Sequence, residues 1–204
     1  GAGSGNFSNY ILLQRPKQLY VIEPSKMAKI LEDCLANTRN VTFINDFLKG
    51  KAEDLKGKVD TMFYINVLEH VEKDAEELKL AFDSLKPGGH LCIYVPAHNQ
   101  LYGSFDEKVG HYRRYSKKGL RRLLEEAGFE IEKINYSDIV GILPWIVSFK
   151  ILKTKHLSPN SVLVYDKLVI PLIRLQEKIF KPPVGKNLWA LAQKPQKARL
   201  KNIK

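Results

Sequence analysis

The segment from Pro96 to Tyr115 is dense in side chains that can do chemistry. It holds two histidines, two arginines and three tyrosines within 20 residues, without the periodicity of a core helix or strand. Histidine exchanges protons near neutral pH, so His98 or His111 can accept a proton from a substrate hydroxyl. We therefore predict His111 and His98 as the catalytic residues. No metal site is predicted, because these histidines and Asp106 lack a short ligand spacing such as H-x-x-x-H.

The same segment offers groups that can bind a substrate. Arg113 and Arg114 can clamp a phosphate or a carboxylate. The alternative is that they form the solvated start of a helix capped by Ser116. Asp106 can orient His111, a pairing that the sequence leaves open. The predicted substrate-binding residues are Tyr102, Asp106, Tyr112, Arg113 and Arg114.

The chain begins with a glycine-rich loop, GAGSGNF, followed by a helical stretch. Gly1, Gly3 and Gly5 alternate, which lets backbone N–H groups and a ligand approach each other closely at a helix N-terminus. A dinucleotide-binding G-x-G-x-x-G motif needs its third glycine at position 6, where this chain has Asn6. The loop therefore indicates a close ligand and disfavours a nicotinamide dinucleotide.

Polar side chains follow three of the predicted strands. Glu23 comes directly after the strand at Leu19–Ile22, where a carboxylate can accept both hydroxyls of a ribose. Asp46 can accept a hydrogen bond from an adenine amine while Phe47 covers the ring. Asn66 follows the next strand. Because ligands of open α/β sheets bind at the carboxyl ends of the strands, these residues and the glycine loop predict one crevice.

The elements that must position these residues alternate between strands and helices. Short runs rich in β-branched and aromatic residues predict buried strands at Leu19–Ile22, Val41–Asn45, Thr61–Ile65 and His90–Val95. Helical spacing of apolar residues predicts helices at Ser25–Leu35, Lys73–Leu85 and Lys117–Ala127. Two more strands are predicted at Glu130–Tyr136 and Asn187–Gln193. This alternation indicates a doubly wound α/β domain with a mostly parallel sheet.

An apolar and basic insertion separates the last two predicted strands, at about 137–186. Ile139–Leu152 and Val162–Phe180 are its helical candidates, with Pro171 as a kink. The net charge of +11 is concentrated here, since residues 137–204 hold 13 Lys and Arg against 3 Asp and Glu. Such a segment can face an anionic membrane surface or nucleic acid. The alternative is a pair of helices that simply packs on the edge of the sheet.

With these motifs in place, the sequence resembles the class I S-adenosylmethionine-dependent methyltransferases, of the type 11/12-like branch. The motifs that carry the resemblance are GAGSGNF, VIEPS, NDF, NVLEHVEKD and LKPGGHLCIYVPA. The resemblance implies S-adenosyl-L-methionine as the cofactor and S-adenosyl-L-homocysteine as the product. It also implies that His70 shapes the cofactor crevice. The cofactor-binding residues that we predict are Gly1, Ala2, Gly3, Gly5, Asn6, Glu23, Pro24, Asp46, Phe47, Asn66, Val67 and Leu68.

The resemblance also implies a seven-stranded Rossmann-like sheet whose last strand, Asn187–Gln193, runs antiparallel. Members of this family carry a strand directly before the first glycine, and this chain has no residue before Gly1. The first strand is therefore missing from the sequence, and we expect these 204 residues to be part of a longer natural chain. We treat residues 1–204 as a single methyltransferase domain.

Composition restricts the class of protein and its compartment. The 44% of hydrophobic residues suffice for one core and exclude a disordered chain. Two cysteines are too few for a disulfide framework, which favours a reducing compartment. The longest apolar run, Ile139–Phe149, is about half of what a membrane-spanning helix needs. With no signal peptide visible, we predict a cytoplasmic protein that can associate with a membrane.

Together these features predict a methyltransferase that acts on a small-molecule or lipid-linked acceptor. Residues 137–204 can contact an anionic membrane surface, and the sequence favours this over nucleic acid because long aliphatic side chains outnumber stacking aromatics there. An RNA methyltransferase is the alternative that the basic segment supports. A second alternative is a catalytically inactive cofactor-binding or scaffold module. The acceptor atom and the oligomeric state stay open.

Overall fold

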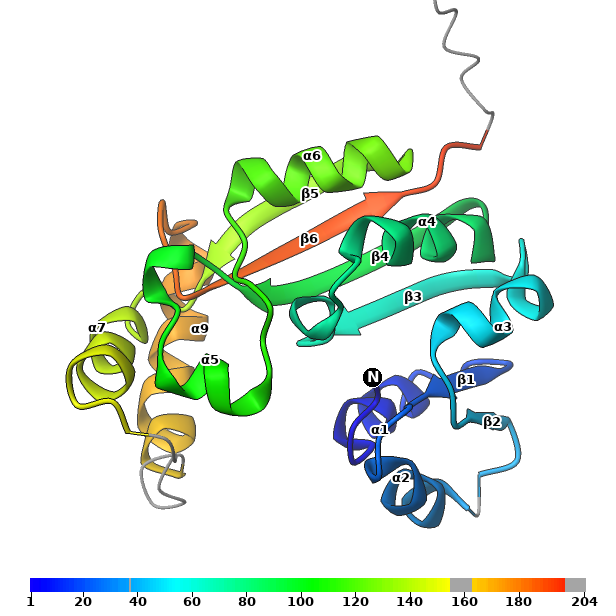
Figure 1. The fold of residues 1–204 in the computed structure, drawn as a ribbon, viewed down its shortest axis with the longest axis horizontal. Helices are drawn as coiled ribbons and strands as arrows, with labels where there is room; N and C mark the ends of the chain where they lie inside the picture. Colours follow the sequence, from blue (N-terminus) through cyan, green and yellow to red (C-terminus); the bar gives the residue numbers. More distant parts are fainter. Residues whose placement is uncertain (37, 155–162, 197–204) are drawn as a thin grey trace, which may run out of the picture.

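The computed structural model describes residues 1–36, 38–154 and 163–196 as strands, helices and connecting loops (Figure 1). Within these ranges there are six strands. They are β1 (Leu19–Ile22), β2 (Val41–Ile44), β3 (Val59–Ile65), β4 (Leu85–Pro96), β5 (Glu130–Ser137) and β6 (Asn187–Gln193). All six strands predicted from the sequence are confirmed, with β4 beginning five residues earlier than expected.

Helices alternate with the strands as predicted, and two of them, at residues 48–55 and 104–109, were not predicted. The helices are α1 (Asn6–Leu12), α2 (Met27–Leu35), α3 (Leu48–Leu55), α4 (Asp74–Ser84), α5 (Ser104–Val109), α6 (Lys117–Ala127), α7 (Ile142–Trp145) and α9 (Ile170–Ile179), with short 3₁₀ turns η1 (Leu68–His70) and η2 (Asn99–Leu101) and π-helical turns η3 (Ile146–Ile151) and η4 (Tyr165–Val169). Ser116 caps α6 by accepting a hydrogen bond from the Gly119 N–H at 2.9 Å. Gly128 ends α6 in the left-handed conformation, with φ of 105°.

The strands form two sheets. β1 and β2 pair in parallel, with Leu19 opposite Val41 and Ile22 opposite Ile44. The second sheet has the order β3-β4-β6-β5, in which β3 and β4 are parallel. β6 runs antiparallel to both of its neighbours, which confirms the prediction for the last strand.

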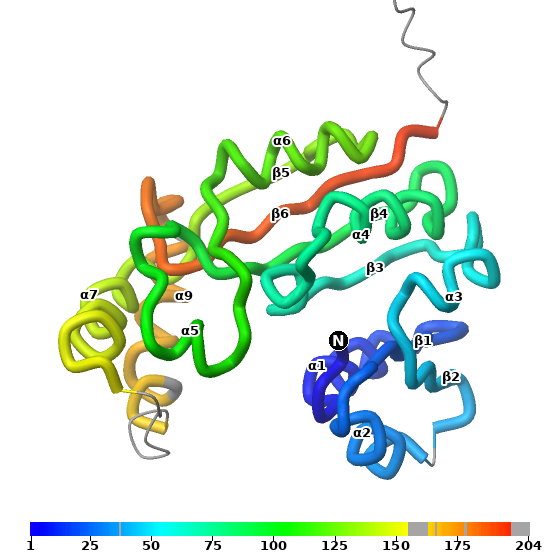
Figure 2. Tube along the Cα trace, viewed as in Figure 1, coloured from blue at the N-terminus to red at the C-terminus, as the bar shows by residue number. Residues whose placement is uncertain are grey.

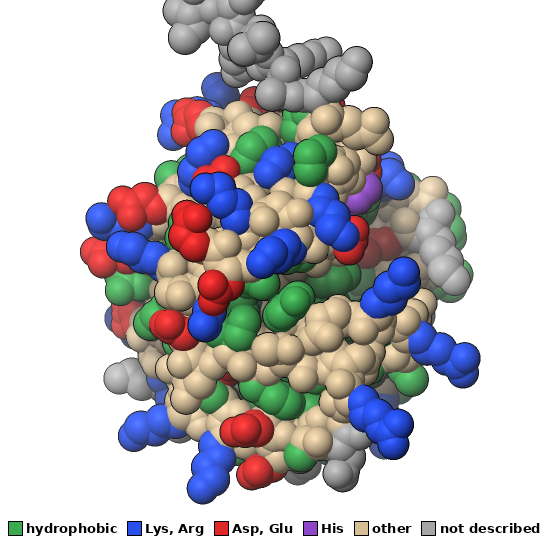
Figure 3. All heavy atoms as spheres, turned by 90° about the vertical axis from the view of Figure 1, so that its right-hand side faces the viewer, with side chains coloured by type: hydrophobic (Ala, Val, Ile, Leu, Met, Phe, Trp, Pro, Cys, Tyr) green, Lys and Arg blue, Asp and Glu red, His purple; other side chains and the backbone are tan. Residues whose placement is uncertain are grey.

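No backbone ladder joins the two sheets within the described ranges. Contact between the two parts comes instead from side chains such as Phe7 and Phe63, whose ring centroids are 5.5 Å apart. Figure 3 shows apolar side chains along a hollow between the part that holds the four-stranded sheet and the part that holds β1 and β2.

The main core lies between the four-stranded sheet and two helices, α4 and α6 (Figure 1). Leu91 and Val95 of β4 and Leu188 of β6 are fully buried there against Leu120 and Leu124 of α6. Along β4 and β6 these buried residues alternate with half-buried ones, as the two-residue period of a strand requires.

The insertion folds into helices at the end of the molecule where β4 ends (Figure 2). Asp138 anchors it, because its buried carboxylate accepts hydrogen bonds from Tyr165 at 2.5 Å and Lys186 at 2.9 Å. Val162, predicted to start the second helix, lies outside the described residues. Pro171 is the second residue of α9, directly after the π-helical turn η4, so the predicted irregularity lies where the helix type changes.

Candidate functional site

The glycine loop and the end of β1 are held together by one carboxylate. Glu23 Oε2 accepts a hydrogen bond from the Gly3 N–H at 2.7 Å, and its Oε1 accepts one from the Ser25 N–H at 3.1 Å. Burial raises the pKa of Glu23, but the hydrogen bonds of Ser25 and Gly3 outweigh this, so that the pKa lies below its ordinary value. Glu23 is therefore an ionised carboxylate at the loop, with lone pairs left for two hydroxyl groups.

The three glycines of the loop serve different purposes. Gly3 and Gly5 have φ of 56° and 87°, which other residues rarely adopt. A side chain at Gly5 would meet Leu31 at 2.9 Å, so Gly5 is needed for packing. A side chain at Gly3 would meet no atom within 4 Å, which leaves this position open to a ligand. Gly1 lies against Val67, whose side chain is 3.0 Å from where a Cβ would stand.

The ends of β1, β2 and β3 lie at one edge, as predicted. The Glu23 N–H donates to Ile44 O, so Glu23 and the residues after β2 are neighbours. Asp46 and Phe47 are exposed there, and Asp46 Oδ1 accepts a hydrogen bond from the Phe47 N–H at 2.7 Å. Asn66 has φ of 52° and donates its backbone N–H to Tyr94 O.

The other predicted cofactor residues differ in how deeply they are buried. Ala2 and Pro24 are half-buried and Asn6 is exposed at the start of α1. Leu68, in contrast, is fully buried in the main core. Its side chain therefore belongs to the core, and the assignment of Leu68 to the cofactor site stays a prediction. A cavity of about 270 Å³ lies beside Glu23, between α2 and the strands β1 and β2.

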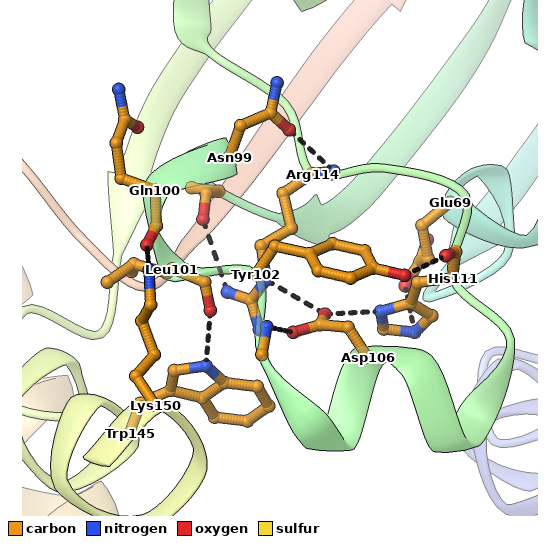
Figure 4. A network of polar contacts seen from close by, with 12 residues as sticks. Glu69, Asn99, Gln100, Leu101, Tyr102, Asp106, His111, Arg114, Trp145 and Lys150 are labelled. Atoms are coloured by element: carbon orange, nitrogen blue, oxygen red, sulfur yellow. Dashed lines mark hydrogen bonds and ion pairs between the residues drawn. The ribbon is translucent and has the colours of Figure 1, made fainter. Parts of the chain in front are cut away.

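A buried polar network forms in the segment after β4 (Figure 4). Asp106 is fully buried, and its Oδ1 lies 2.7 Å from His111 Nδ1 and 2.9 Å from Arg114 Nε. Its Oδ2 accepts a hydrogen bond from the Gly103 N–H at 2.9 Å. Burial raises the pKa of Asp106, but the hydrogen bonds of His111 and Arg114 lower it below the ordinary value. Because the carboxylate is ionised and only accepts, His111 carries its proton on Nδ1 and turns Nε2 away from Asp106.

This network includes one arginine of the predicted substrate clamp. Arg114 is 2% exposed, pairs with Asp106 and covers the Trp145 ring at 4.4 Å, so both charged groups are paired within the protein, and their contact with a substrate stays a prediction. Arg113 forms an ion pair with Asp74 at 2.9 Å. The sequence could not show these pairings, because both carboxylates lie on other turns of the fold.

The two predicted tyrosines differ in what they can offer a substrate. The Tyr102 hydroxyl donates to His111 O at 2.7 Å and so holds the histidine backbone. Tyr112 is 55% exposed, and its backbone N–H donates to Glu69 O at 2.9 Å. Of the pair, Tyr112 therefore has the side chain that a substrate can contact.

His111 meets residues from the end of β3 that sequence reasoning did not assign to catalysis. Its Nε2 lies 3.8 Å from Glu69 Oε1, and its ring centroid lies 4.6 Å from that of His70. Glu69 is fully buried, and burial raises its pKa to about 7. The only sequence signal for this cluster is the Glu-His pair directly after a strand end.

His98, the other predicted catalytic histidine, has a different environment. Its ring stacks on Tyr136 of β5, with centroids 4.9 Å apart and planes 12° from parallel. The backbone at His98 has φ of 61°. Burial, and then the charge of Arg114, lower the pKa of His98, which keeps the ring neutral. Its place beside β5 separates it from the contacts that join Asp106, His111 and Glu69.

Comparison with protein families decides the class of this chain. A family model described as a methyltransferase domain matches residues 1–134, which include the glycine loop, Glu23 and the Asp106–His111 segment. The chain belongs to this family. The protein is accordingly a methyltransferase, and S-adenosylmethionine is the methyl donor that family membership implies. Comparison with curated proteins gave no match.

Solved structures show the same fold. An S-adenosylmethionine-dependent methyltransferase from Archaeoglobus fulgidus is 20% identical with a TM-score of 0.60, over 95% of this chain and 83% of that chain. Phosphoethanolamine N-methyltransferase 2 from Haemonchus contortus, in complex with S-adenosyl-L-methionine, is 20% identical with a TM-score of 0.63, over 96% and 47%. The [4+2]-cyclase SpnF is 17% identical with a TM-score of 0.62, over 96% and 72%. The likeness establishes an α/β Rossmann-like methyltransferase fold, which by itself leaves the acceptor open.

The residues at the crevice fit this methyl donor. Gly3 leaves open space at the loop, and the ionised Glu23 beside it matches a ribose diol. Exposed Phe47 offers an apolar face next to Asp46. Within the described part of the chain, none of the helices combines the length and hydropathy needed to cross a bilayer.

Proposed function

We propose that this methyltransferase binds S-adenosylmethionine at the Gly1–Gly5 loop, with Glu23 on the ribose and Asp46 and Phe47 at the adenine. The loop, Glu23 and Val67 support this proposal because they meet at one edge of the sheets. The bound cofactor supplies an electrophilic methyl group, so the protein needs mainly to align the acceptor with it. His111, held by Asp106, and exposed Tyr112 are the residues that we assign to the acceptor side.

The proposed acceptor is an amphipathic or lipid-linked small molecule. The observation that carries this proposal is an exposed apolar face on the helices of the insertion. Leu168, Leu172, Leu175 and Ile179 are 58–77% exposed, and their spacing of three and four residues places them on one side of η4 and α9. A soluble surface rarely exposes so many large aliphatic side chains together.

Basic side chains accompany this apolar face. Lys150, Lys153, Lys167, Arg174 and Lys181 are all exposed on the insertion. Cations beside an apolar helix face suit the headgroup region of an anionic membrane. We therefore propose that the insertion rests on an anionic membrane surface, from which the enzyme takes its acceptor.

The insertion is also packed against the acceptor side of the site. Phe149 of η3 is buried, with its ring centroid 5.2 Å from that of Phe105 in α5. The Trp145 indole N–H donates to Leu101 O at 2.9 Å. Asp106 also belongs to α5. A membrane that binds the insertion is therefore separated from the Asp106–His111 pair by this one helix. This connection favours a lipid-linked acceptor over one that arrives from bulk solution.

The test is a methyl-transfer assay with S-adenosylmethionine labelled on its methyl group. A total lipid extract and a total RNA fraction are offered separately to the full chain. We expect label in the lipid fraction and none in the RNA. Label in RNA alone would overturn the acceptor class. S-adenosylhomocysteine binding without transfer to either fraction would instead support a cofactor-binding module.

A further inference from the structure

Three side chains from two distant parts of the sequence converge beside the proposed acceptor site. Glu69 and His70 belong to η1, directly after β3, and His111 follows α5. Their ligand atoms, one from each side chain, all lie within 4.8 Å of one another. Glu69 is fully buried, His111 is partly buried and His70 is exposed, so the cluster opens toward solvent on one side.

The Glu69 carboxylate lacks a partner that would explain its burial. Neither Oε1 nor Oε2 has a hydrogen-bond partner within the described residues, and both are inaccessible to solvent. A buried carboxylate without donors is costly, and proteins satisfy such groups by a proton, a cation or a metal ion. The His111 Nε2 atom lies 3.8 Å from Oε1, which is too long for a hydrogen bond.

His111 is oriented as a metal-binding histidine usually is. His111 Nδ1 is held by Asp106 at 2.7 Å, which leaves the Nε2 lone pair directed at Glu69. A metal-binding histidine typically uses its second nitrogen in this way, with a carboxylate or a backbone carbonyl as the partner.

We propose that Glu69, His70 and His111 form a binding site for one divalent transition-metal ion. Two imidazoles and one carboxylate suit Zn²⁺, Mn²⁺ or Fe²⁺, whereas Mg²⁺ and Ca²⁺ prefer oxygen ligands only. Three protein ligands leave open positions on the exposed side, where the hydroxyl of an acceptor can coordinate. Binding of the ion stands on the cluster alone; its role with the acceptor rests on the proposed function. The sequence-based prediction of no metal site considered His98, Asp106 and His111 and did not consider Glu69.

The test is titration of the chelator-treated full chain with ZnCl₂ and, separately, with MnCl₂, followed by calorimetry and thermal unfolding. We expect one ion per chain and a rise in Tm on binding. In Glu69→Gln, affinity for the ion falls by about 10- to 100-fold or more and the rise in Tm is lost. Without metal, the Tm of Glu69→Gln is equal to or above that of the parent, because an unpaired buried carboxylate has been replaced by a neutral group. His70→Ala, a substitution at an exposed residue, lowers the affinity for the ion by the same factor.

The matched control is His90→Ala, which removes a histidine that contacts Glu132 at the other end of β4. It keeps the affinity of the parent. Failure of the parent to bind either ion, or undiminished binding by both Glu69→Gln and His70→Ala, overturns the site. S-adenosylhomocysteine titrated in the presence of EDTA separates the two proposals. If S-adenosylhomocysteine binds and no metal ion binds, only the metal site is contradicted. If a metal ion binds and S-adenosylhomocysteine does not, only the proposed function is contradicted.

Discussion

Oδ1 of Asp106 lies 2.7 Å from His111 Nδ1, and the same oxygen accepts a hydrogen bond from Arg114 Nε at 2.9 Å. One buried carboxylate oxygen thus fixes both the tautomer of a histidine and the position of an arginine. The arginine neutralises the carboxylate, and the histidine presents its other nitrogen to Glu69. Asp106 therefore positions His111, the member of the network that we assign to the proposed acceptor site.

Replacing His111 by alanine separates turnover from cofactor binding. We expect His111→Ala to lower kcat by about 10²-fold or more, as removal of a residue that acts directly on a reacting group does. Its affinity for S-adenosylhomocysteine stays within about threefold of the parent, because Glu23 and the glycine loop are untouched. Steady-state kinetics with labelled S-adenosylmethionine and calorimetry measure the two quantities. An equal loss in both would show that His111 supports the cofactor crevice instead.

The two adjacent arginines have unequal effects on stability. Arg114→Ala leaves the buried Asp106 carboxylate without its cation, and we expect a loss of about 3–5 kcal/mol in the free energy of unfolding. Arg113→Ala is the matched control. Its side chain is 31% exposed in the pair with Asp74, so the loss is about 1 kcal/mol. Urea unfolding of both variants measures the difference, and equal losses would contradict the assigned roles.

Substitutions to aspartate test whether the apolar face of α9 binds a membrane. Leu172→Asp with Ile179→Asp places two carboxylates at exposed positions, so folding is preserved. Each side chain contributes about 1.5–3 kcal/mol when buried, so binding to phosphatidylglycerol vesicles weakens by roughly 100-fold or more. Leu13→Asp, at an equally exposed leucine after α1, is the control and binds as the parent does. Sedimentation with vesicles at low and high salt is the measurement. Binding that vanishes in high salt in the parent would indicate charge alone and count against insertion of the apolar face.

The pH dependence of stability reports on Glu23. Its pKa in the folded protein lies below the ordinary value of 4.5, so the ionised form is favoured by folding. Its contribution is therefore fully present above the ordinary pKa and is lost as the pH falls through the lowered pKa. We expect parent and Glu23→Gln to differ most in unfolding free energy at neutral pH and to converge below about pH 4.5. A constant difference from pH 7 to pH 3 would contradict the hydrogen bonds drawn to this carboxylate.

Regular elements were predictable because local patterns and tertiary packing agree. Residues 117–127 place Leu120 and Leu124 on one face between a Ser cap and a terminal glycine, and the predicted α6 is confirmed without a change of bounds. The rule that strand ends share an edge predicted that the glycine loop and Glu23 lie together, and the Gly3–Glu23 hydrogen bond shows that they do. In contrast, α5 was not predicted. Its six residues are too few to show a helical period, and Asp106 looks like a polar loop residue until its partners are known.

The roles within the polar segment could not be read from the sequence. Arg113 and Arg114 are adjacent residues of the same type. Arg114 is 2% exposed because its side chain lies over the Trp145 ring, whereas the Arg113 side chain is 31% exposed. Glu69 likewise stands in a motif that implied places in the crevice for Asn66, Val67, Leu68 and His70, but none for Glu69. Its contact with His111 joins positions 42 residues apart, which no local pattern encodes.

The most direct test of the account is calorimetric titration of S-adenosylhomocysteine into the full chain, with NADH as the control ligand. We predict micromolar binding of S-adenosylhomocysteine, about 8 kcal/mol, and none of NADH. In Glu23→Ala the affinity falls by about 10- to 100-fold, because hydrogen bonds to a charged group are lost, while Glu53→Ala, at an exposed acid of α3, keeps the parent's affinity. Absence of S-adenosylhomocysteine binding, or undiminished binding by Glu23→Ala, would contradict the cofactor site described here.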